Sequence, residues 1–167
     1  MAYDFFGIPV SELNVWLIWI LPFAAAMIIP AVGKFSKLTT GRVAVAFAAM
    51  SAISAATLFP MALGAHEIHH QIMWIDAIGL KAGVLADPLS VIMSNVVGWI
   101  SFLIMCYSTG YMKGDKDITR FWFWMMFFIG SMQLIILSDN LLQVFFGWEG
   151  VGLASYALIS FWYRDKK

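Results

Sequence analysis

Glu149 is the residue best suited to do chemistry in this sequence, because it is a carboxylic acid within a long apolar stretch. It is the only Asp, Glu, Lys, Arg or His in the five longest apolar segments. An acidic residue at the centre of a membrane helix costs about 2.5 to 3.5 kcal/mol to insert, so such residues usually face a partner, a cavity or an ion path. Glu149 therefore predicts a proton-transfer site. The structural alternative is a protonated carboxyl group that hydrogen-bonds to a neighbouring helix.

A second pattern, His66-Glu67-x-x-His70, has the spacing of a zinc metalloprotease. On a helix this spacing places two imidazoles on one face, with the glutamate as general base. The mechanism usually requires a third protein ligand, for which Asp76 or Asp87 are candidates. Hairpin-like sequence follows the pattern at once, so we prefer solvated loop histidines, with a regulatory metal site or external pH sensing as lesser alternatives. A membrane zinc protease is a remote alternative.

The composition is that of an integral membrane protein. Hydrophobic residues make up 62% of the chain and charged residues only 12%, against about 25% charged residues in soluble domains. A membrane-spanning helix needs about 20 predominantly apolar residues. We therefore predict an all-α polytopic membrane protein, residues 1–167 forming a single membrane domain, with spans at residues 15–32, 43–65, 89–111, 121–137 and 141–163.

The basic residues predict how the helices cross the membrane. Short cytoplasmic loops are enriched in Lys and Arg. Nine of the ten follow the first, third or fifth span, and only Lys81 lies elsewhere; the nine are Lys34, Lys37, Arg42, Lys113, Lys116, Arg120, Arg164, Lys166 and Lys167. This alternation predicts five crossings, with the N-terminus outside and the C-terminus inside.

The segment between the second and third spans is then external. Two apolar runs, residues 72–75 and 80–85, flank a turn at residues 76–79 and indicate a short β-hairpin. An isolated hairpin is only marginally stable in water. We therefore expect this hairpin to lie against a neighbouring surface.

Other polar residues allow simpler interpretations. Gln133 precedes Glu149 by one helix and is either a relay that bonds water or an ordinary interhelical hydrogen-bonding group. Ser138 and Asp139 are expected to cap the fifth helix. The single cysteine, Cys106, excludes a disulfide or a cysteine-held iron–sulfur cluster within this chain. The formal net charge of zero indicates no nucleic-acid partner.

The fifth span carries a family signature. The run from Ser138 to Tyr163, with Gly147-Trp148-Glu149-Gly150 at its centre, resembles the subunit L, or chain 5, family of NADH:quinone oxidoreductase (complex I). Asp87 with the Pro-Leu-Ser that follows it, and Arg120 with the next phenylalanine, also match. The resemblance covers nearly the whole chain and is strongest from Asp87 onward. The family also includes relatives in Mrp-type sodium/proton antiporters.

The resemblance implies a function for the site. Such proteins conduct protons through two inverted helical bundles, each with a buried acid, which Glu149 matches, paired with a lysine on a later helix. Family members are several times longer, so we expect this chain to be the N-terminal part of a longer antiporter-like subunit. The residues that match the family, Gly150, Trp148, Asp87 and Arg120, are expected to support the site. Gln133 is added as a supporting residue because it lies on the helix before Glu149.

The resemblance also implies the surroundings of the chain. No cofactor is expected in it, because NADH or a related donor, flavin, iron–sulfur clusters and quinone would be bound by other subunits. Expected partners are the remainder of the subunit, adjacent antiporter-like subunits of a respiratory complex and the lipid bilayer. We expect a prokaryotic plasma membrane in preference to an organelle inner membrane. The alternatives are an Mrp-type antiporter subunit and a structural or assembly subunit without proton transfer.

Overall fold

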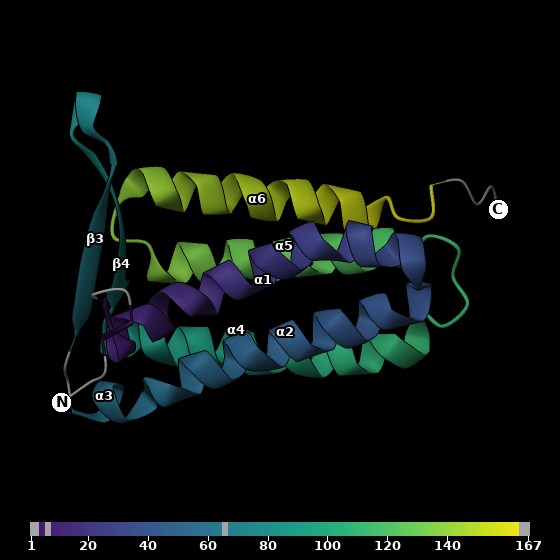
Figure 1. The fold of residues 1–167 in the computed structure, drawn as a ribbon, viewed down its shortest axis with the longest axis horizontal. Helices are drawn as coiled ribbons and strands as arrows, with labels where there is room; N and C mark the ends of the chain where they lie inside the picture. Colours follow the sequence, from purple (N-terminus) through teal and green to yellow (C-terminus); the bar gives the residue numbers. More distant parts are fainter. Residues whose placement is uncertain (1–3, 6–7, 65–66, 164–167) are drawn as a thin grey trace.

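A computed structural model describes residues 4–5, 8–64 and 67–163 of the chain. Six α-helices, four strands and one short 3-10 helix follow one another in this part (Figure 1). They are β1 (Asp4–Phe5), β2 (Ile8–Pro9), α1 (Val10–Phe35), α2 (Lys37–Thr57), α3 (Phe59–Leu63), β3 (Ile68–Ile75), η1 (Asp76–Ile78), β4 (Leu80–Ala86), α4 (Pro88–Tyr111), α5 (Ile118–Leu137) and α6 (Leu141–Ile159).

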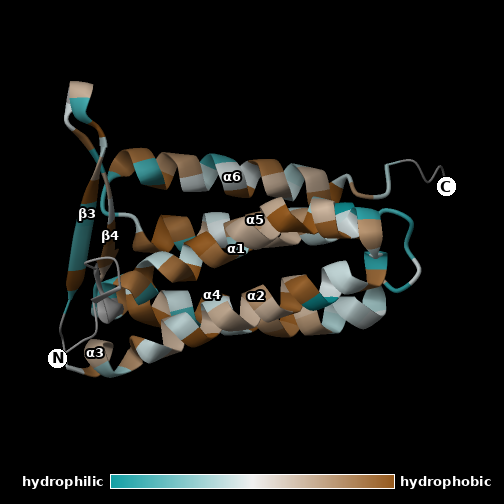
Figure 2. Cartoon of the chain, viewed as in Figure 1, coloured by the Kyte–Doolittle hydropathy of each residue, from teal (hydrophilic) through white to brown (hydrophobic). Residues whose placement is uncertain are grey.

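The long helices lie side by side as a bundle, with the β3–β4 hairpin across one end (Figure 1). Five helical segments are long and apolar enough to cross a membrane, with α2 and α3 counted as one. Apolar residues run along the helices, whereas the connections at the end opposite the hairpin are largely hydrophilic (Figure 2). The predicted number of spans is confirmed by length and composition.

Most helix boundaries differ from the predicted ones by a few residues, and three of the differences have a clear physical cause. The second span was predicted to begin at residue 43, but α2 begins at Lys37, because the Ser36 hydroxyl accepts a hydrogen bond from the Thr39 amide and caps the helix. This span is also broken at Leu58, two residues before Pro60, which cannot continue the α2 hydrogen-bond ladder. The fifth span was predicted to reach residue 163, but α6 ends at Ile159. Apolarity alone predicted the longer helix, whereas the following residues turn back toward α5.

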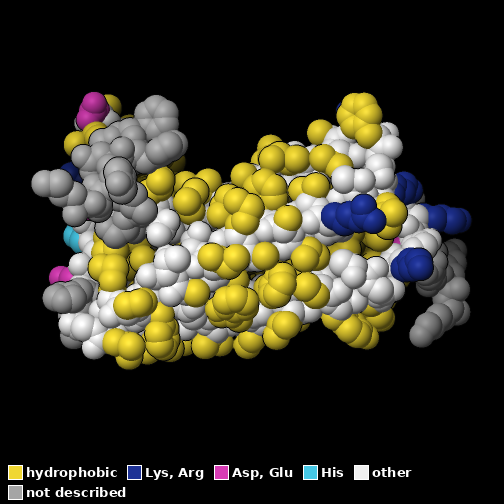
Figure 3. Space-filling view, turned by 60° about the horizontal axis from the view of Figure 1, so that its bottom comes forward, with side chains coloured by type: hydrophobic (Ala, Val, Ile, Leu, Met, Phe, Trp, Pro, Cys, Tyr) yellow, Lys and Arg dark blue, Asp and Glu magenta, His cyan; other side chains and the backbone are white. Residues whose placement is uncertain are grey.

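Charge is segregated between the two ends of the bundle. Lys and Arg side chains gather at the end opposite the hairpin on the face that Figure 3 shows. This end holds the last turn of α1, the first turns of α2 and α5, and the α4–α5 connection. Of the described basic residues only Lys81 lies on the hairpin. The segregation agrees with the predicted loop pattern, and the direction of insertion stays a prediction.

The predicted β-hairpin is confirmed. Strands β3 and β4 pair antiparallel from Ile68 opposite Ala86 to Ile75 opposite Leu80, with a bulge near the turn. Gly79 closes the turn with φ of 64°, a left-handed conformation that favours glycine. The base of the hairpin also has the neighbouring surface that it was expected to need. Ile68, Val84 and Ala86 are buried in a cluster with residues of α1, α2, α4 and α5.

Helix α5 is the central helix of the bundle. It contacts α1, α2, α4 and α6, and its side toward α1, α2 and α4 is filled by large buried residues such as Trp122, Met126 and Ile129. The buried face of α2 instead consists of small residues, among them Ala44, Ala48 and Ala52. Small residues let helix backbones approach closely where no hydrophobic effect drives association. The last helix, α6, packs chiefly against α5 at the edge of the bundle.

Candidate proton-transfer site

Helix α6 positions Glu149. The helix begins at Asn140, whose side-chain oxygen accepts a hydrogen bond of 3.0 Å from the Gln143 amide. The expectation that Ser138 and Asp139 form this cap is therefore wrong. The Asp139 carboxylate instead accepts hydrogen bonds from the hairpin, and the Ser138 hydroxyl bonds back to the carbonyl group of Leu134.

A stripe of small residues joins α6 to α5. Gly147, Gly150 and Ala154 are buried, and they recur at the three- and four-residue spacing of one helix face. A β-carbon at Gly147 would lie 3.1 Å from the Ser131 carbonyl oxygen, so the two backbones are nearly in contact. This packing fixes the rotation of α6 about its own axis.

The rotation of α6 turns Glu149 away from the bundle. Glu149 is the ninth of the nineteen residues of α6, and it is exposed. Its neighbour Trp148 is 69% exposed, and Phe145 and Phe146 are also exposed. Within the described residues, the Glu149 side chain makes no hydrogen bond or ion pair. The carboxyl group therefore lies halfway along an apolar helix, on the face that the described chain leaves uncovered.

Gln133 is not brought to Glu149. It is fully buried, its Oε1 accepts a hydrogen bond of 2.7 Å from the Ser94 hydroxyl, and its Nε2 donates one of 3.0 Å to the Ser94 carbonyl oxygen. Gln133 thus faces α4, whereas α5 turns Ser131 and Ile135 toward α6. The structure shows the interhelical hydrogen-bonding role for Gln133, and its relay role stays a prediction.

The other two supporting residues lie at opposite ends of the bundle. Asp87 caps α4 in a reciprocal capping box with Ser90, and the hydrogen bonds from Ser90 lower the pKa of the Asp87 carboxyl group. Arg120 lies in the first turn of α5, donates a hydrogen bond of 2.8 Å to the Phe161 carbonyl oxygen and is 3.4 Å from an Asp117 carboxylate oxygen. Both residues have structural partners, and neither is close to the centre of α6.

A polar cluster at the hairpin end was not predicted from the sequence. The side chain of Asp139 is 2% exposed, and it accepts hydrogen bonds from Gln71 at 2.6 Å and Asn140 at 2.7 Å, with His69 at 3.1 Å. Partial burial raises the pKa of the Asp139 carboxyl group, but these hydrogen bonds outweigh it and the pKa is lowered. The Gln143 side chain extends the cluster by accepting from the Gly83 amide at 2.8 Å. A concentration of polar residues at positions 138–143 was the only sequence signal for it.

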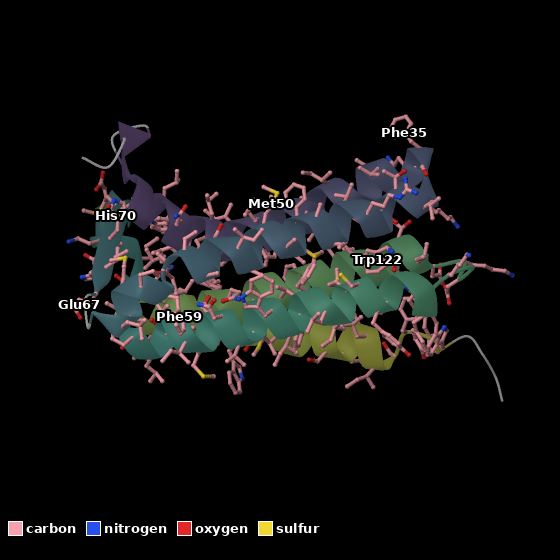
Figure 4. All side chains as sticks on the ribbon, turned by 90° about the horizontal axis from the view of Figure 1, so that it is seen from below. Phe35, Met50, Phe59, Glu67, His70 and Trp122 are labelled. Carbon is pink, nitrogen blue, oxygen red and sulfur yellow. The ribbon has the colours of Figure 1, made fainter. Side chains whose placement is uncertain are left out.

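The zinc-protease pattern does not form the helix that its chemistry requires. His70 lies in strand β3, Glu67 precedes this strand, and the two residues lie apart at the hairpin end (Figure 4). His66 lies outside the described residues. His70 accepts a hydrogen bond from the Trp16 indole at 3.1 Å and lies 3.5 Å from Glu12. Within the described part of the chain, no three His, Cys, Asp or Glu side chains are grouped closely enough to hold a metal ion. The metalloprotease interpretation therefore loses its structural basis.

Comparison with known proteins identifies the family. Residues 73–122 match the family described as NADH-Ubiquinone oxidoreductase (complex I), chain 5 N-terminus. NADH-quinone oxidoreductase subunit L of Rickettsia bellii is 40% identical over 155 residues, which cover 90% of this chain and 24% of that protein. The Mycobacterium tuberculosis subunit L is 38% identical (89% and 25% covered), and the spinach chloroplast NAD(P)H-quinone oxidoreductase subunit 5 is 35% identical (89% and 21%). The chain thus spans about a quarter of the length of these relatives. By sequence it belongs to the complex I subunit L, or chain 5, family and corresponds to its N-terminal region.

Proposed function

We propose that this chain is part of a membrane subunit of a redox-linked proton pump, in which Glu149 takes up and releases a proton. The observation that carries the proposal is the place of Glu149, a carboxylic acid at the midpoint of an apolar helix that is long enough to span a membrane. Intramembrane acids are functional by default because their insertion is costly. The relatives named above are quinone oxidoreductase subunits, which favours a redox-linked pump over an Mrp-type antiporter.

The uncovered face of α6 supports a partner for Glu149 from outside the described residues. Only 22% of the apolar span of α6 is buried, the smallest share among the five spans. We propose that the remainder of the subunit, or an adjacent antiporter-like subunit, covers this face and buries the carboxyl group there. The pKa of a buried carboxyl group rises, and a nearby cation lowers it again. A cation that approaches and retreats would therefore drive proton release and uptake.

The proposed carrier chemistry needs no cofactor in this chain. A carboxyl group binds and releases a proton without any change of redox state. The electron donor, flavin, iron–sulfur clusters and quinone are proposed to belong to other subunits. The location is proposed to be a prokaryotic plasma membrane.

The decisive experiment is Glu149→Gln in the assembled complex, reconstituted in vesicles. Gln has nearly the shape of Glu and still forms hydrogen bonds, but it cannot titrate. We expect a loss of proton pumping, with electron transfer and assembly measured in parallel. The matched control is Leu153→Gln, which adds the same amide one turn away on the exposed face of α6 and should leave pumping intact. Full pumping in the assembled Glu149→Gln complex would instead make this chain a structural subunit.

A further inference from the structure

A cavity of about 760 Å³ lies at the basic end of the bundle, far from Glu149. It is formed by the first residues of α2 and by the α4–α5 connection, and Trp122 of α5 forms part of its wall. Its lining includes one carboxylate, that of Asp115, and four cationic side chains, which are Lys37, Arg42, Lys113 and Lys116.

Most of the positive charge in this cavity is not neutralised. The carboxylate of Asp115 is already engaged, because it accepts hydrogen bonds from the Asp117 amide at 2.7 Å and from the Trp162 indole at 3.1 Å. Lys37 donates a hydrogen bond of 2.8 Å to the carbonyl oxygen of Lys116. The side-chain cations of Arg42, Lys113 and Lys116 form no ion pair or hydrogen bond with any described residue. The cavity therefore suits an anion.

Trp122 offers the cavity a buried hydrogen-bond donor. The residue is 1% exposed, and its Nε1–H has no acceptor among the described residues. A buried polar group without a partner is costly, which points to an acceptor that binds there. Gly41, which also lines the cavity, lies directly against this edge of the indole, since a β-carbon at position 41 would lie 3.3 Å from Nε1. Trp122 lies near the end of the bundle where the basic residues gather (Figure 4).

Exposed apolar and aromatic side chains lie on α2 and α4, the two helices that border the cavity. Leu38, in the cavity wall, is 70% exposed, and on α4 Tyr107 and Leu103 are 72% and 63% exposed. An anion with a long apolar part would thus meet cations at one end and apolar helix surfaces at the other. Basic pockets between membrane helices bind phospholipid headgroups in this way.

We propose that this cavity binds the headgroup of an anionic membrane phospholipid. The phosphate contacts Arg42, Lys113 and Lys116 and accepts the Trp122 Nε1–H, and the acyl chains lie along α2 and α4. This site is independent of proton transfer at Glu149.

The test is lipid binding to the purified full-length protein that contains this chain, followed by native mass spectrometry. Delipidated protein is titrated with phosphatidylglycerol and, separately, with phosphatidylcholine. We expect at least tenfold tighter binding of the first phosphatidylglycerol molecule. The triple substitution Arg42→Gln, Lys113→Gln and Lys116→Gln should remove this preference, and Trp122→Phe, which deletes only the donor, should weaken it about threefold. Lys34→Gln is the matched control, because Lys34 is a basic residue at the same end of the bundle but does not line the cavity.

Three results would overturn the proposal. They are equal affinity for the two lipids, displacement of the bound lipid by millimolar inorganic phosphate, and an affinity unchanged by the substitutions. If the triple variant does not fold, the single variant Arg42→Gln is used in its place. Its affinity for phosphatidylglycerol should be about threefold weaker than that of the wild type. The proposal is rejected if this affinity equals that of Lys34→Gln.

Discussion

The side chain of Gln71, on the β3–β4 hairpin, donates a 2.6 Å hydrogen bond to Asp139, which lies 68 residues further along the chain between α5 and α6. Val84 of the other strand forms an isolated β-bridge with Ser138, next to Asp139. The hairpin is therefore attached to the last two helices by both side-chain and backbone contacts. Since Glu149 lies on α6, the hairpin is attached directly before the helix that carries the proposed proton site.

Removal of the Asp139 carboxylate should loosen this attachment. Asp139→Ala leaves the Gln71 and Asn140 donors without their acceptor, which we expect to cost about 2 kcal/mol. The measurement is hydrogen exchange of the β3–β4 amides in the full-length protein. Asp76→Asn is the control, since Asp76 is exposed in the hairpin turn and its side chain has no described partner. Equal exchange rates in the two variants would contradict the assigned role of Asp139.

The same attachment should depend on acidic pH. The pKa of Asp139 is lowered from its ordinary value of 3.8, so the folded state binds this proton less readily than the unfolded state. Its contribution to stability is therefore complete above about pH 4 and is lost as the pH falls through the lowered pKa. The protection factors of the hairpin amides, corrected for the intrinsic exchange rate at each pH, should fall between pH 5 and pH 2 in the wild type. In Asp139→Asn this part of the pH dependence should disappear, and its persistence would point to another titrating group.

The Ser94–Gln133 pair should behave as an energetically coupled unit. Gln133→Leu leaves the buried Ser94 hydroxyl without its acceptor, and Ser94→Ala removes one of the two partners of Gln133. Interhelical hydrogen bonds in membranes contribute about 0.6 to 2 kcal/mol. The double variant should therefore lose less stability than the sum of the single variants, as measured by thermal unfolding. The rate of proton pumping by the Gln133→Leu complex distinguishes a packing role of Gln133 from a proton-relay role. If Gln133 only packs, the pumping rate per assembled complex stays unchanged, whereas loss of a relay lowers it.

Two glycines of α6 should respond differently to an added methyl group. A β-carbon at Gly147 would lie 2.7 Å from Cγ1 of Ile135, whereas at Gly152 it would meet nothing within 4 Å. Gly147→Ala should thus destabilise the α5–α6 contact by about 1 to 3 kcal/mol through overpacking. Gly152→Ala should change stability by no more than about 0.5 kcal/mol. Apparent melting temperatures in one detergent would compare them, and a reversed order would exclude the small-residue stripe as the α5–α6 contact.

Local pattern predicted most of the fold. The five apolar segments and the turn at residues 76–79 follow from hydropathy and turn chemistry, which depend on residues near one another in the chain. Boundaries were less accurate where a local cap or a distant contact outweighed apolarity. Residues 161–163 are apolar, but they leave the helix, and the Phe161 carbonyl oxygen and ring both contact Arg120, 41 residues earlier.

In the candidate site, too, local features could be predicted from the sequence and distant contacts could not. The depth of Glu149 could be counted along the sequence, but its direction could not, because that depends on which face of α6 meets α5. Gln133 and Asp139 were assigned roles from their neighbours in the chain, whereas the structure gives them partners 39 and 68 residues away.

The sequence by itself determined that the chain is built of membrane-length helices, that basic residues collect in alternate loops and that one acid lies at the centre of the last helix. Only the tertiary structure decided that this acid faces outward, that Asp139 holds the hairpin and that three cations with no partner among the described residues share a cavity with the Trp122 indole. The physical reason is that hydropathy and charge are properties of each residue and can be read along the chain. These contacts instead depend on how closely small residues let helices that are distant in the sequence approach each other.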